Sequence, residues 1–401
     1  MKSIEQEIRR EWTEHILPFW AGLRDDRHGG YYGEVSVNLQ TDTLAPKGGI
    51  ATARQLWSFS AAYRVTGEEV WASHAKHAYS FLRDRLIDRE HGGMYWMVDH
   101  EGQPLDTRKH VYAQSFAVYS LSEYSRATSD AEALELAREL FGLIEEKGYD
   151  TGIQAYKEEF DREWHEQPNE MLSENGLNAD ITMNTTIHVL EAYTTLYHVL
   201  EAYTTLYRVW PDPRVRSALE NLLSMLYNRI YDPEKKRLNV FFDRSWNSLL
   251  DLTSFGHDIE ASWLIDDAMK AIGSDHADYA KMVVDIAYQI ADTAVSEDGS
   301  LMNEQHGDRI DDTRIWWVQA ESMVGFYNAY QRTGDTRFLD LIDRMWKYTK
   351  THIIDPRGGG EWYWSVQADG QPDRREIAGP WKCPYHNSRF CIEMIERMNE
   401  A

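Results

Sequence analysis

Two histidines near the starts of predicted helices are candidates for moving a proton. His257 is followed three residues later by Glu260, so the two side chains share one helix face, where the carboxylate can orient the imidazole and tune its pKa. His386 comes just after a proline, a residue suited to the first turn of a helix. Two histidines brought to one cavity can take a proton from one face of a substrate and return one to the other. Either histidine alone could instead be a hydrogen-bonded structural residue.

Three further polar residues stand at similar positions. Asn184 and His188, four residues apart, share a helix face and could bind a substrate hydroxyl or carbonyl, although Asn184 alone could equally be a helix cap. Arg54 interrupts an apolar stretch, and a buried arginine needs a partner. That partner could be an electron-rich oxygen of a substrate or enolate, or an internal carboxylate.

Aromatic residues add a weak indication of sugar binding. The chain has 15 Trp and 23 Tyr, several of them in predicted loops or at helix starts. A pyranose offers an apolar face to an aromatic ring and its hydroxyls to polar groups around the rim. Trp316 and Trp317 offer a stacking platform, with the Glu321 carboxylate nearby, and Tyr112 is a weaker candidate. Paired tryptophans and a lone tyrosine are also typical of a core.

These candidates stand at the heads of six segments with helical periodicity. Each segment places apolar residues at i, i+3, i+4 and i+7. The six segments are 54–65, 114–126, 188–209, 258–272, 318–332 and 387–399. Most are followed, after a similar turn, by a second amphipathic stretch. Six such helix pairs favour an all-α (α/α)6 barrel, a toroid in which the inner helices run the same way and their starts meet at one mouth.

Short β-like pieces lie between the helix pairs. The glycine-led segments 28–37, 91–98 and 358–366 predict arms of hairpins in the connecting loops. No proline-rich or serine-rich linker interrupts the pattern, so residues 1–401 are predicted to form a single catalytic barrel domain.

A ten-residue duplication interrupts the regular repeat. The segment from His188 to Tyr197 is followed at once by an identical copy, from His198 to Tyr207. Ten residues turn a helix by about 1000° and lengthen it by about 15 Å, so the two copies cannot bury the same face. We expect one copy to dock as the inner helix while the other extends or bulges. If the second copy docks, His198 takes the place of His188, and Asn184 is displaced.

Charge and composition exclude several classes of partner. The 42 basic and 66 acidic residues give a net charge of −24, which argues against nucleic acids and anionic membranes. No apolar run is long enough to span a bilayer and no secretory leader is evident, so a cytoplasmic protein is expected. Cys383 and Cys391 form no motif and are expected as buried thiols.

Other chemistries have little support in the sequence. It contains no GxGxxG motif at a strand–helix junction, no P-loop, no GxSxG and no HExxH. A metal site built from His188, His257, Glu260 and His386 has no diagnostic spacing, so no metal is predicted.

At these residues the chain resembles the N-acylglucosamine 2-epimerase superfamily, nearly from end to end. The segments that carry the resemblance are 18–20, 29–33, 109–114, 173–176, 183–184, 188–193, 256–263, 315–321 and 381–387. The resemblance implies an (α/α)6 barrel and, in the branch that acts on β-1,4-linked disaccharides, a sugar 2-epimerase that needs no metal or other cofactor. Its partner would be a small sugar, bound by a monomer or weak homodimer.

The resemblance also implies roles for individual residues. His257 and His386 match the acid/base pair that exchanges the proton at C2 of a ring-opened aldose through a cis-enediolate. His188 matches a residue linked to ring opening, and Arg54 one that stabilises the oxygens of the intermediate. The residues that match the lining of the reducing-end sugar site are Tyr112, Asn184, Glu260, Trp317 and Trp381, while Trp246 matches a residue that stacks on the second sugar.

Three alternative functions stay open at the level of sequence. An aldose–ketose isomerase, or a 2-epimerase of free glucose and mannose, would share the enediol chemistry. A glycoside hydrolase would need two carboxylates flanking the scissile bond, and Glu260 and Glu321 are available. A non-catalytic sugar-binding protein would use the same polar residues for recognition alone.

Overall fold

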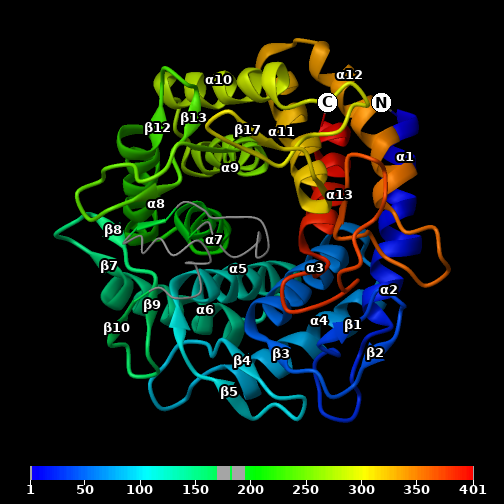
Figure 1. The fold of residues 1–401 in the computed structure, drawn as a ribbon. Helices are drawn as coiled ribbons and strands as arrows, with labels where there is room; N and C mark the ends of the chain where they lie inside the picture. The colour runs from blue at the N-terminus through cyan, green and yellow to red at the C-terminus, as the bar shows by residue number, and fades with distance from the viewer. Residues whose placement is uncertain (1, 169–180, 183–194, 401) are drawn as a thin grey trace.

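The computed structural model describes residues 2–168, 181–182 and 195–400, and its helices form two concentric rings (Figure 1). The inner ring consists of α3 (Gly49–Thr66), α5 (Val111–Thr128), α7 (Thr195–Val209), α9 (Phe255–Ile272), α11 (Trp316–Thr333) and α13 (Tyr385–Glu400). Each inner helix packs on the next, and α13 packs on α3 and closes the ring. The predicted (α/α)6 barrel is confirmed.

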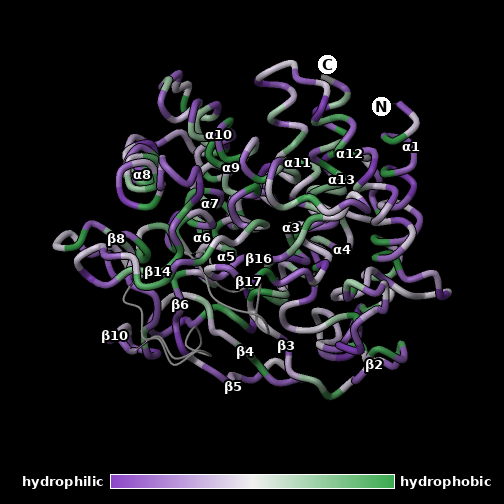
Figure 2. The backbone as a smooth tube through the Cα atoms, turned by 45° about the horizontal axis from the view of Figure 1, so that its top comes forward, coloured by the Kyte–Doolittle hydropathy of each residue, from purple (hydrophilic) through white to green (hydrophobic). Residues whose placement is uncertain are grey.

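The outer ring covers the inner one helix by helix. It consists of α1 (Lys2–Glu11) with α2 (Leu17–Ala21), α4 (Glu69–Phe81), α6 (Ala131–Leu143), α8 (Pro213–Met225), α10 (Ala277–Thr293) and α12 (Arg337–Tyr348). Five π-helical turns adjoin these helices: Trp12–Ile16, Leu82–Leu86, Ile144–Gly148, Leu226–Ile230 and Thr349–Ile353. In Figure 2, α1 and α8 carry both hydrophilic and hydrophobic colours, as expected for helices with one side on the ring and one in water.

Short strands connect the helices on the side where the inner helices begin. They are β1 (Glu34–Val35), β2 (Thr41–Asp42), β3 (Lys47–Gly48), β4 (Met97–Val98), β5 (Pro104–Asp106), β6 (Lys109–His110), β7 (Tyr149–Asp150), β8 (Ala155–Tyr156), β9 (Glu159–Phe160), β10 (Glu166–Gln167), β11 (Ile181–Thr182), β12 (Tyr231–Asp232), β13 (Arg237–Leu238), β14 (Phe241–Phe242), β15 (Leu252–Ser254), β16 (Glu304–His306), β17 (Arg309–Asp311), β18 (Arg314–Ile315) and β19 (Ser365–Val366). All pair antiparallel in sheets of two or three strands. The predicted hairpin arms are confirmed, with shorter strands than expected.

Five inner helices begin earlier than their apolar periodicity predicted, namely α3, α5, α9, α11 and α13. For example, α3 begins at Gly49 rather than at Arg54, and α9 at Phe255 rather than at residue 258. The first turns of these helices are buried and carry polar residues, so the hydrophobic pattern does not mark them. The polar candidate residues at the starts of the six predicted segments therefore lie inside the helices, in their first or second turn.

Three buried lysines anchor the starts of inner helices. Lys47, Lys109 and Lys382 lie just before α3, α5 and α13, and each is at most 2% exposed. Lys47 binds Asp25 at 2.7 Å and Lys109 binds Asp88 at 3.1 Å. Lys382 binds Glu361 in the same way. Because each carboxylate comes from the loop after the preceding outer helix, the pairs tie loop to helix start and hold the first turns in place.

The inner helices end in a repeated turn with a left-handed residue. Gly67 and Gly334 have φ of 72° and 71°, and each amide donates to a carbonyl four residues earlier. Ser129 adopts the same conformation after α5. This regular end keeps the helices in a common register.

The second copy of the duplicated decapeptide forms the inner helix α7. Residues 198–206 are all buried, and α7 packs between α5 and α9. The expectation that one copy docks as the inner helix is confirmed, and it is the copy that carries His198. Residues 188–194 of the first copy lie outside the described part of the chain.

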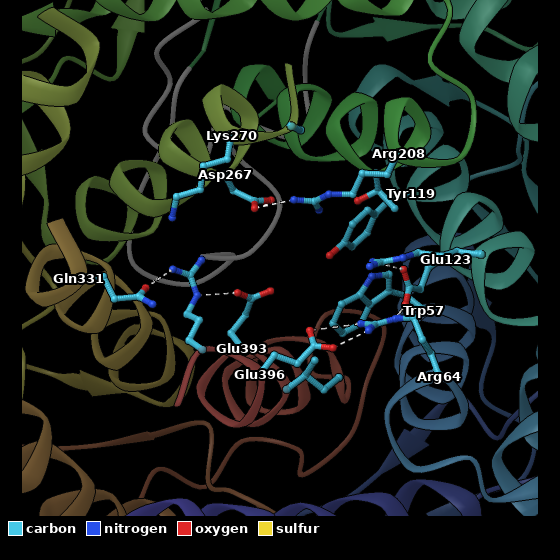
Figure 3. A pocket seen from close by; sticks show the side chains of 15 residues that line it. Trp57, Arg64, Tyr119, Glu123, Arg208, Asp267, Lys270, Gln331, Glu393 and Glu396 are labelled. Atoms are coloured by element: carbon cyan, nitrogen blue, oxygen red, sulfur yellow. Dashed lines mark hydrogen bonds and ion pairs between the residues drawn. The ribbon is translucent and has the colours of Figure 1, made fainter. Parts of the chain in front are cut away.

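A belt of ion pairs joins the inner helices at the end opposite to their starts. Each inner helix has a cation in its last turn, where it complements the helix dipole: Arg64, Arg126, Arg208, Lys270, Arg332 and Arg397. Arg64 binds Glu123 of α5 and Glu396 of α13, and Arg208 binds Asp267 of α9. Figure 3 shows these pairs around a cavity of about 360 Å³.

No helix in the described ranges is both long enough and apolar enough to cross a membrane.

We predict that Arg64→Ala lowers the free energy of unfolding by about 2 kcal/mol, because it leaves the Glu123 carboxylate, only 2% exposed, with Arg126 as its remaining cation. Urea unfolding at pH 7.5 measures the change. Lys281→Ala is the matched control: its pair with Asp285 is exposed, so a loss within about 0.5 kcal/mol is expected. Equal small losses in both variants would contradict a stabilising belt.

Candidate active site

The starts of the inner helices bring histidines from three different helices together. His198 of α7, His257 of α9 and His386 of α13 are each at most 3% exposed. Trp317 of α11 connects two of them, since its ring lies 4.6 Å from the ring of His257 and 5.4 Å from that of His386. The expected meeting of His257 and His386 at one end of the barrel is therefore observed.

His257 is oriented by its own helix cap. Its Nδ1 lies 2.6 Å from the Ser254 hydroxyl, in the strand that leads into α9. The expected pairing with Glu260 is wrong, because the Glu260 carboxylate accepts from the Tyr197 hydroxyl at 2.9 Å and binds Arg389. Burial lowers the pKa of His257 well below its ordinary value, and electrostatic interaction with His198 acts in the same direction. The ring is therefore neutral at pH 7.

His386 is oriented by a carboxylate from another helix. Its Nδ1 lies 2.7 Å from Glu321 of α11 and 3.8 Å from Glu260 of α9. Burial lowers the pKa of His386 well below its ordinary value, and the nearby Arg389 and Arg54 guanidinium groups lower it further. Both histidines are thus uncharged bases, and Nδ1 of each is hydrogen-bonded to a neighbouring side chain.

His198 takes the place that the sequence offered to either copy of the decapeptide. Its Nδ1 lies 3.0 Å from Glu201, one turn along α7, and its ring lies 5.2 Å from that of Tyr112. Asn184 and His188 lie outside the described residues. His198, which the sequence offered only as an alternative, is therefore the histidine of this repeat that the structure brings to the site.

Arg54 lies fully buried beside these histidines. Its Nη2 donates to the Tyr112 hydroxyl at 2.9 Å, and its guanidinium lies over the rings of Phe116 and Tyr385, at 4.3 and 4.9 Å. It also donates to the backbone carbonyl of Trp381 at 3.4 Å. These described contacts hold the guanidinium with a phenol, two aromatic faces and a carbonyl.

A second buried arginine, Arg389, binds the carboxylates of the site. Arg389 of α13 is paired with Glu201, Glu260 and Glu321, which come from α7, α9 and α11. Burial raises the pKa of Glu321 well above its ordinary value, with the charges of Glu260 and Glu201 acting in the same direction and Arg389 opposing. Burial thus favours the protonated form of the carboxyl group beside His386, while its ion pair with Arg389 favours the ionised form.

In the described part of the chain, one set of side chains is close enough together to hold a metal ion, and it belongs to the cluster around Arg389. Oxygens of Glu260 and Glu321 and a nitrogen of His386 lie within 4.8 Å of one another. Arg389 contacts all three atoms and supplies the positive charge. The arrangement is that of an ion-pair cluster.

The predicted tryptophans divide into two groups. Trp316 lies edge-on to His386, with ring centres 5.5 Å apart, and Trp381 packs on Trp96 beside Arg54. Trp246 lies instead among the hairpins, where it donates to the carbonyl of Ile153 and packs against Phe242. Its contacts with described residues are therefore at the rim and not with the histidines.

Sequence reasoning missed Glu201, Tyr385 and Arg389. A signal was present, since Glu201 follows His198 by three residues and Arg389 follows His386 by three. The spacing that drew attention to Glu260 thus recurs twice. What it does not indicate is that Arg389 binds carboxylates of three other helices.

The geometry defines a class of protein: an (α/α)6 barrel whose inner-helix starts present neutral histidines, an arginine and tryptophans in one buried site. The family model for N-acylglucosamine 2-epimerase (GlcNAc 2-epimerase) matches residues 29–389. A cellobiose 2-epimerase from Ruminococcus albus is 48% identical over 394 residues, covering 98% of both chains. One from Dictyoglomus turgidum is 41% identical over 402 residues, covering 99% of this chain and all of the other.

Solved structures agree with these relatives. The structure of cellobiose 2-epimerase from Bacillus thermoamylovorans superposes with a TM-score of 0.95 at 56% identity, covering 99% of this chain and 100% of the other. Fold and relatives together define the chain as a carbohydrate epimerase, an isomerase. The chain belongs to the N-acylglucosamine 2-epimerase family.

The buried neutral histidines predict a specific pH dependence of stability. Because the pKa of His257 is lowered in the folded state, the unfolded chain takes up a proton below about pH 6.5 that the folded chain does not. The contribution of His257 to the free energy of unfolding therefore decreases as the pH falls below about 6.5. His257→Asn removes the titrating group while keeping a polar atom for Ser254.

We predict that the wild type loses about 1.4 kcal/mol relative to His257→Asn between pH 7.5 and pH 5.5, the value for one proton over one pH unit. Urea unfolding of both proteins at the two pH values measures the difference. A stability difference that is the same at both pH values would mean that the folded-state pKa of His257 is not lowered.

Proposed function

We propose that this epimerase acts at C2 of the reducing-end glucose of β-1,4-linked disaccharides, converting cellobiose to glucosyl-mannose and lactose to epilactose. The observation that carries the proposal is the placement of His257 and His386 against the same tryptophan, Trp317, with both rings neutral and Nδ1 of each held. The substrate class is supported by the relatives named cellobiose 2-epimerase.

The proposed chemistry is proton exchange through an enediolate. One histidine removes the C2 proton of the ring-opened aldose, and the electron pair of the C–H bond moves toward the aldehyde oxygen, which becomes an enediolate oxygen. A neutral imidazole is suited to this step, because only the unprotonated form accepts a proton. Rotation about C2–C3 presents the other face of C2 to the second histidine, which takes up a proton from water before this step, gives it to C2 and inverts the centre. The first histidine then releases the proton it removed to water, so both rings return to the neutral form.

The developing charge needs a cation or hydrogen-bond donor near the oxygen. Arg54 is permanently charged and is oriented by Tyr112 and by two aromatic faces, so it can stabilise the enediolate oxygens. His198 stands next to this pair, and we assign it the ring-opening role that the sequence had offered to His188. Tyr112, Trp316, Trp317 and Trp381 would line the reducing-end sugar, and Trp246 would contact the second sugar from the rim.

The contacts of Glu260 and Glu321 weigh against a hydrolase. A glycoside hydrolase places its two carboxyl groups on either side of the scissile bond. Here both carboxylates bind the same guanidinium, that of Arg389, and one of them orients His386. They are better suited to supporting the histidine than to protonating a glycosidic oxygen.

We predict that His257→Ala and His386→Ala each lower kcat for cellobiose epimerisation by at least about 100-fold, because each removes one of two required proton-transfer groups. Proton NMR in D2O follows deuterium at C2 and the mannose-configured reducing end. The control is Trp246→Phe, which is expected to keep kcat and change KM for the disaccharide. Retained turnover in either histidine variant, with a folded circular dichroism spectrum, would reject the pair.

We also predict that His198→Ala loses at least about 100-fold in kcat, while His188→Ala stays within about 3-fold of the wild type, because His198 is the copy beside Tyr112. The two variants remove the same side chain from identical decapeptides and are therefore matched controls for each other. The opposite ranking would assign the catalytic position to the first copy.

A further inference from the structure

A continuous chain of buried polar groups links His198 to His386. Glu201 lies 3.0 Å from Nδ1 of His198, and Arg389 binds Glu201 at one end and Glu321 at the other. Glu321 in turn lies 2.7 Å from Nδ1 of His386. Every member is at most 5% exposed, so water competes little for these contacts.

Three donor side chains converge on Glu201 in this chain. Both its oxygens lie 2.6 Å from the Tyr385 hydroxyl, and Arg389 and His198 also bind it. Burial opposes ionisation, but the Arg389 guanidinium and the hydrogen bond from His198 lower the pKa of Glu201 to about 2. Glu201 is thus a carboxylate at every working pH, and it accepts hydrogen bonds only.

A carboxylate at Nδ1 determines the tautomer of the neutral imidazole. Because Glu201 has no proton to donate, Nδ1 of His198 must carry one, and Nε2 is left as the basic nitrogen. Without Glu201 the two tautomers would compete, and the ring would be free to rotate about Cβ–Cγ. The tautomer of the His198 ring, which lies 5.2 Å from the ring of Tyr112, therefore depends on a residue one turn further along α7.

Arg389 keeps Glu201 in this role. Three carboxylates share its guanidinium, and an arginine cannot lose its proton under these conditions. Its planar fork fixes the directions from which the carboxylates approach, which a lysine could not do. The same guanidinium thus holds the carboxylates that hydrogen-bond to both histidines, Glu201 for His198 and Glu321 for His386.

We propose that Glu201 and Arg389 are positioning residues of the epimerase: Glu201, held by Arg389 and Tyr385, keeps His198 in the tautomer with the proton on Nδ1 and the basic nitrogen toward the sugar. The proposal rests on the function proposed above, in which His198 opens the sugar ring. Neither Glu201 nor Arg389 touches the reacting atoms in it.

The first test does not depend on turnover. Nitrogen-15 NMR of the histidine-labelled protein identifies the His198 signals as those lost in His198→Ala, and the coupling pattern reports which ring nitrogen carries the proton. The expected result is a proton on Nδ1 in the wild type and a mixture of tautomers, or a proton on Nε2, in Glu201→Gln. A proton on Nε2 in the wild type, or an unchanged tautomer in Glu201→Gln, would overturn the proposal.

The second test separates positioning from general stability. Glu201→Gln is expected to lower kcat on cellobiose by about 100-fold with KM within about 3-fold, and the double variant with His198→Ala should be no slower than His198→Ala alone. Glu123→Gln is the matched control, since it also neutralises a buried carboxylate paired with arginine, but in the belt at the far end of the barrel. It should lose stability while keeping kcat.

The outcomes distinguish the two proposals. A wild type that turns over no disaccharide, but whose His198 tautomer depends on Glu201, would reject the substrate and keep the positioning role. A wild type with full turnover, in which Glu201→Gln is as active as Glu123→Gln, would reject the positioning role and keep the function. If the fall in kcat in the double variant equals the product of the falls in Glu201→Gln and His198→Ala, the two residues act independently, and the positioning role is rejected.

Discussion

The site depends on the pairing of one buried guanidinium with three buried carboxylates. Arg389 comes from the last inner helix, and its partners Glu201, Glu260 and Glu321 come from the three helices before it. Removing a charge of this kind from water is costly, and only well-directed hydrogen bonds offset the cost. Once the ion pairs form, helices α7, α9, α11 and α13 have little freedom to slide past one another. The positions of the histidines on three of these helices are therefore fixed as well.

The two ends of the barrel use charge in different ways. At the far end, cations in the last helical turns meet carboxylates of neighbouring helices around a cavity, and their effect is mainly on stability (Figure 3). At the catalytic end the charges are buried, and they determine which groups hold protons. The lowered pKa values of His257 and His386 and the raised pKa of Glu321 are consequences of burial that the same residues would not show at the surface.

The duplicated decapeptide offers two identical segments for one inner helix. Both copies carry the same histidine, glutamate and apolar residues, so local propensity cannot choose between them. The copy that continues directly into the turn after α7 is the one in the described helix, since Tyr207 is followed by the Arg208 that pairs with Asp267. This short connection to a fixed partner places His198, among the described residues, beside Tyr112.

The sequence by itself determined the repeat of helix pairs, the barrel and the convergence of His257, His386, Arg54 and Trp317, because helical periodicity and recurring turns are local and a closed ring brings equivalent positions together. It did not determine the partners of those residues. The expected Glu260–His257 pair does not form, since Nδ1 of His257 lies beside the Ser254 hydroxyl and Glu260 binds Arg389, whereas the same spacing does pair His198 with Glu201. Spacing along a buried helix therefore does not decide whether two side chains meet each other or a neighbouring helix. The tertiary structure settled the partners that come from other helices: Glu321 lies 65 positions from His386 and Arg389 lies 188 positions from Glu201, so these contacts depend on how the ring closes.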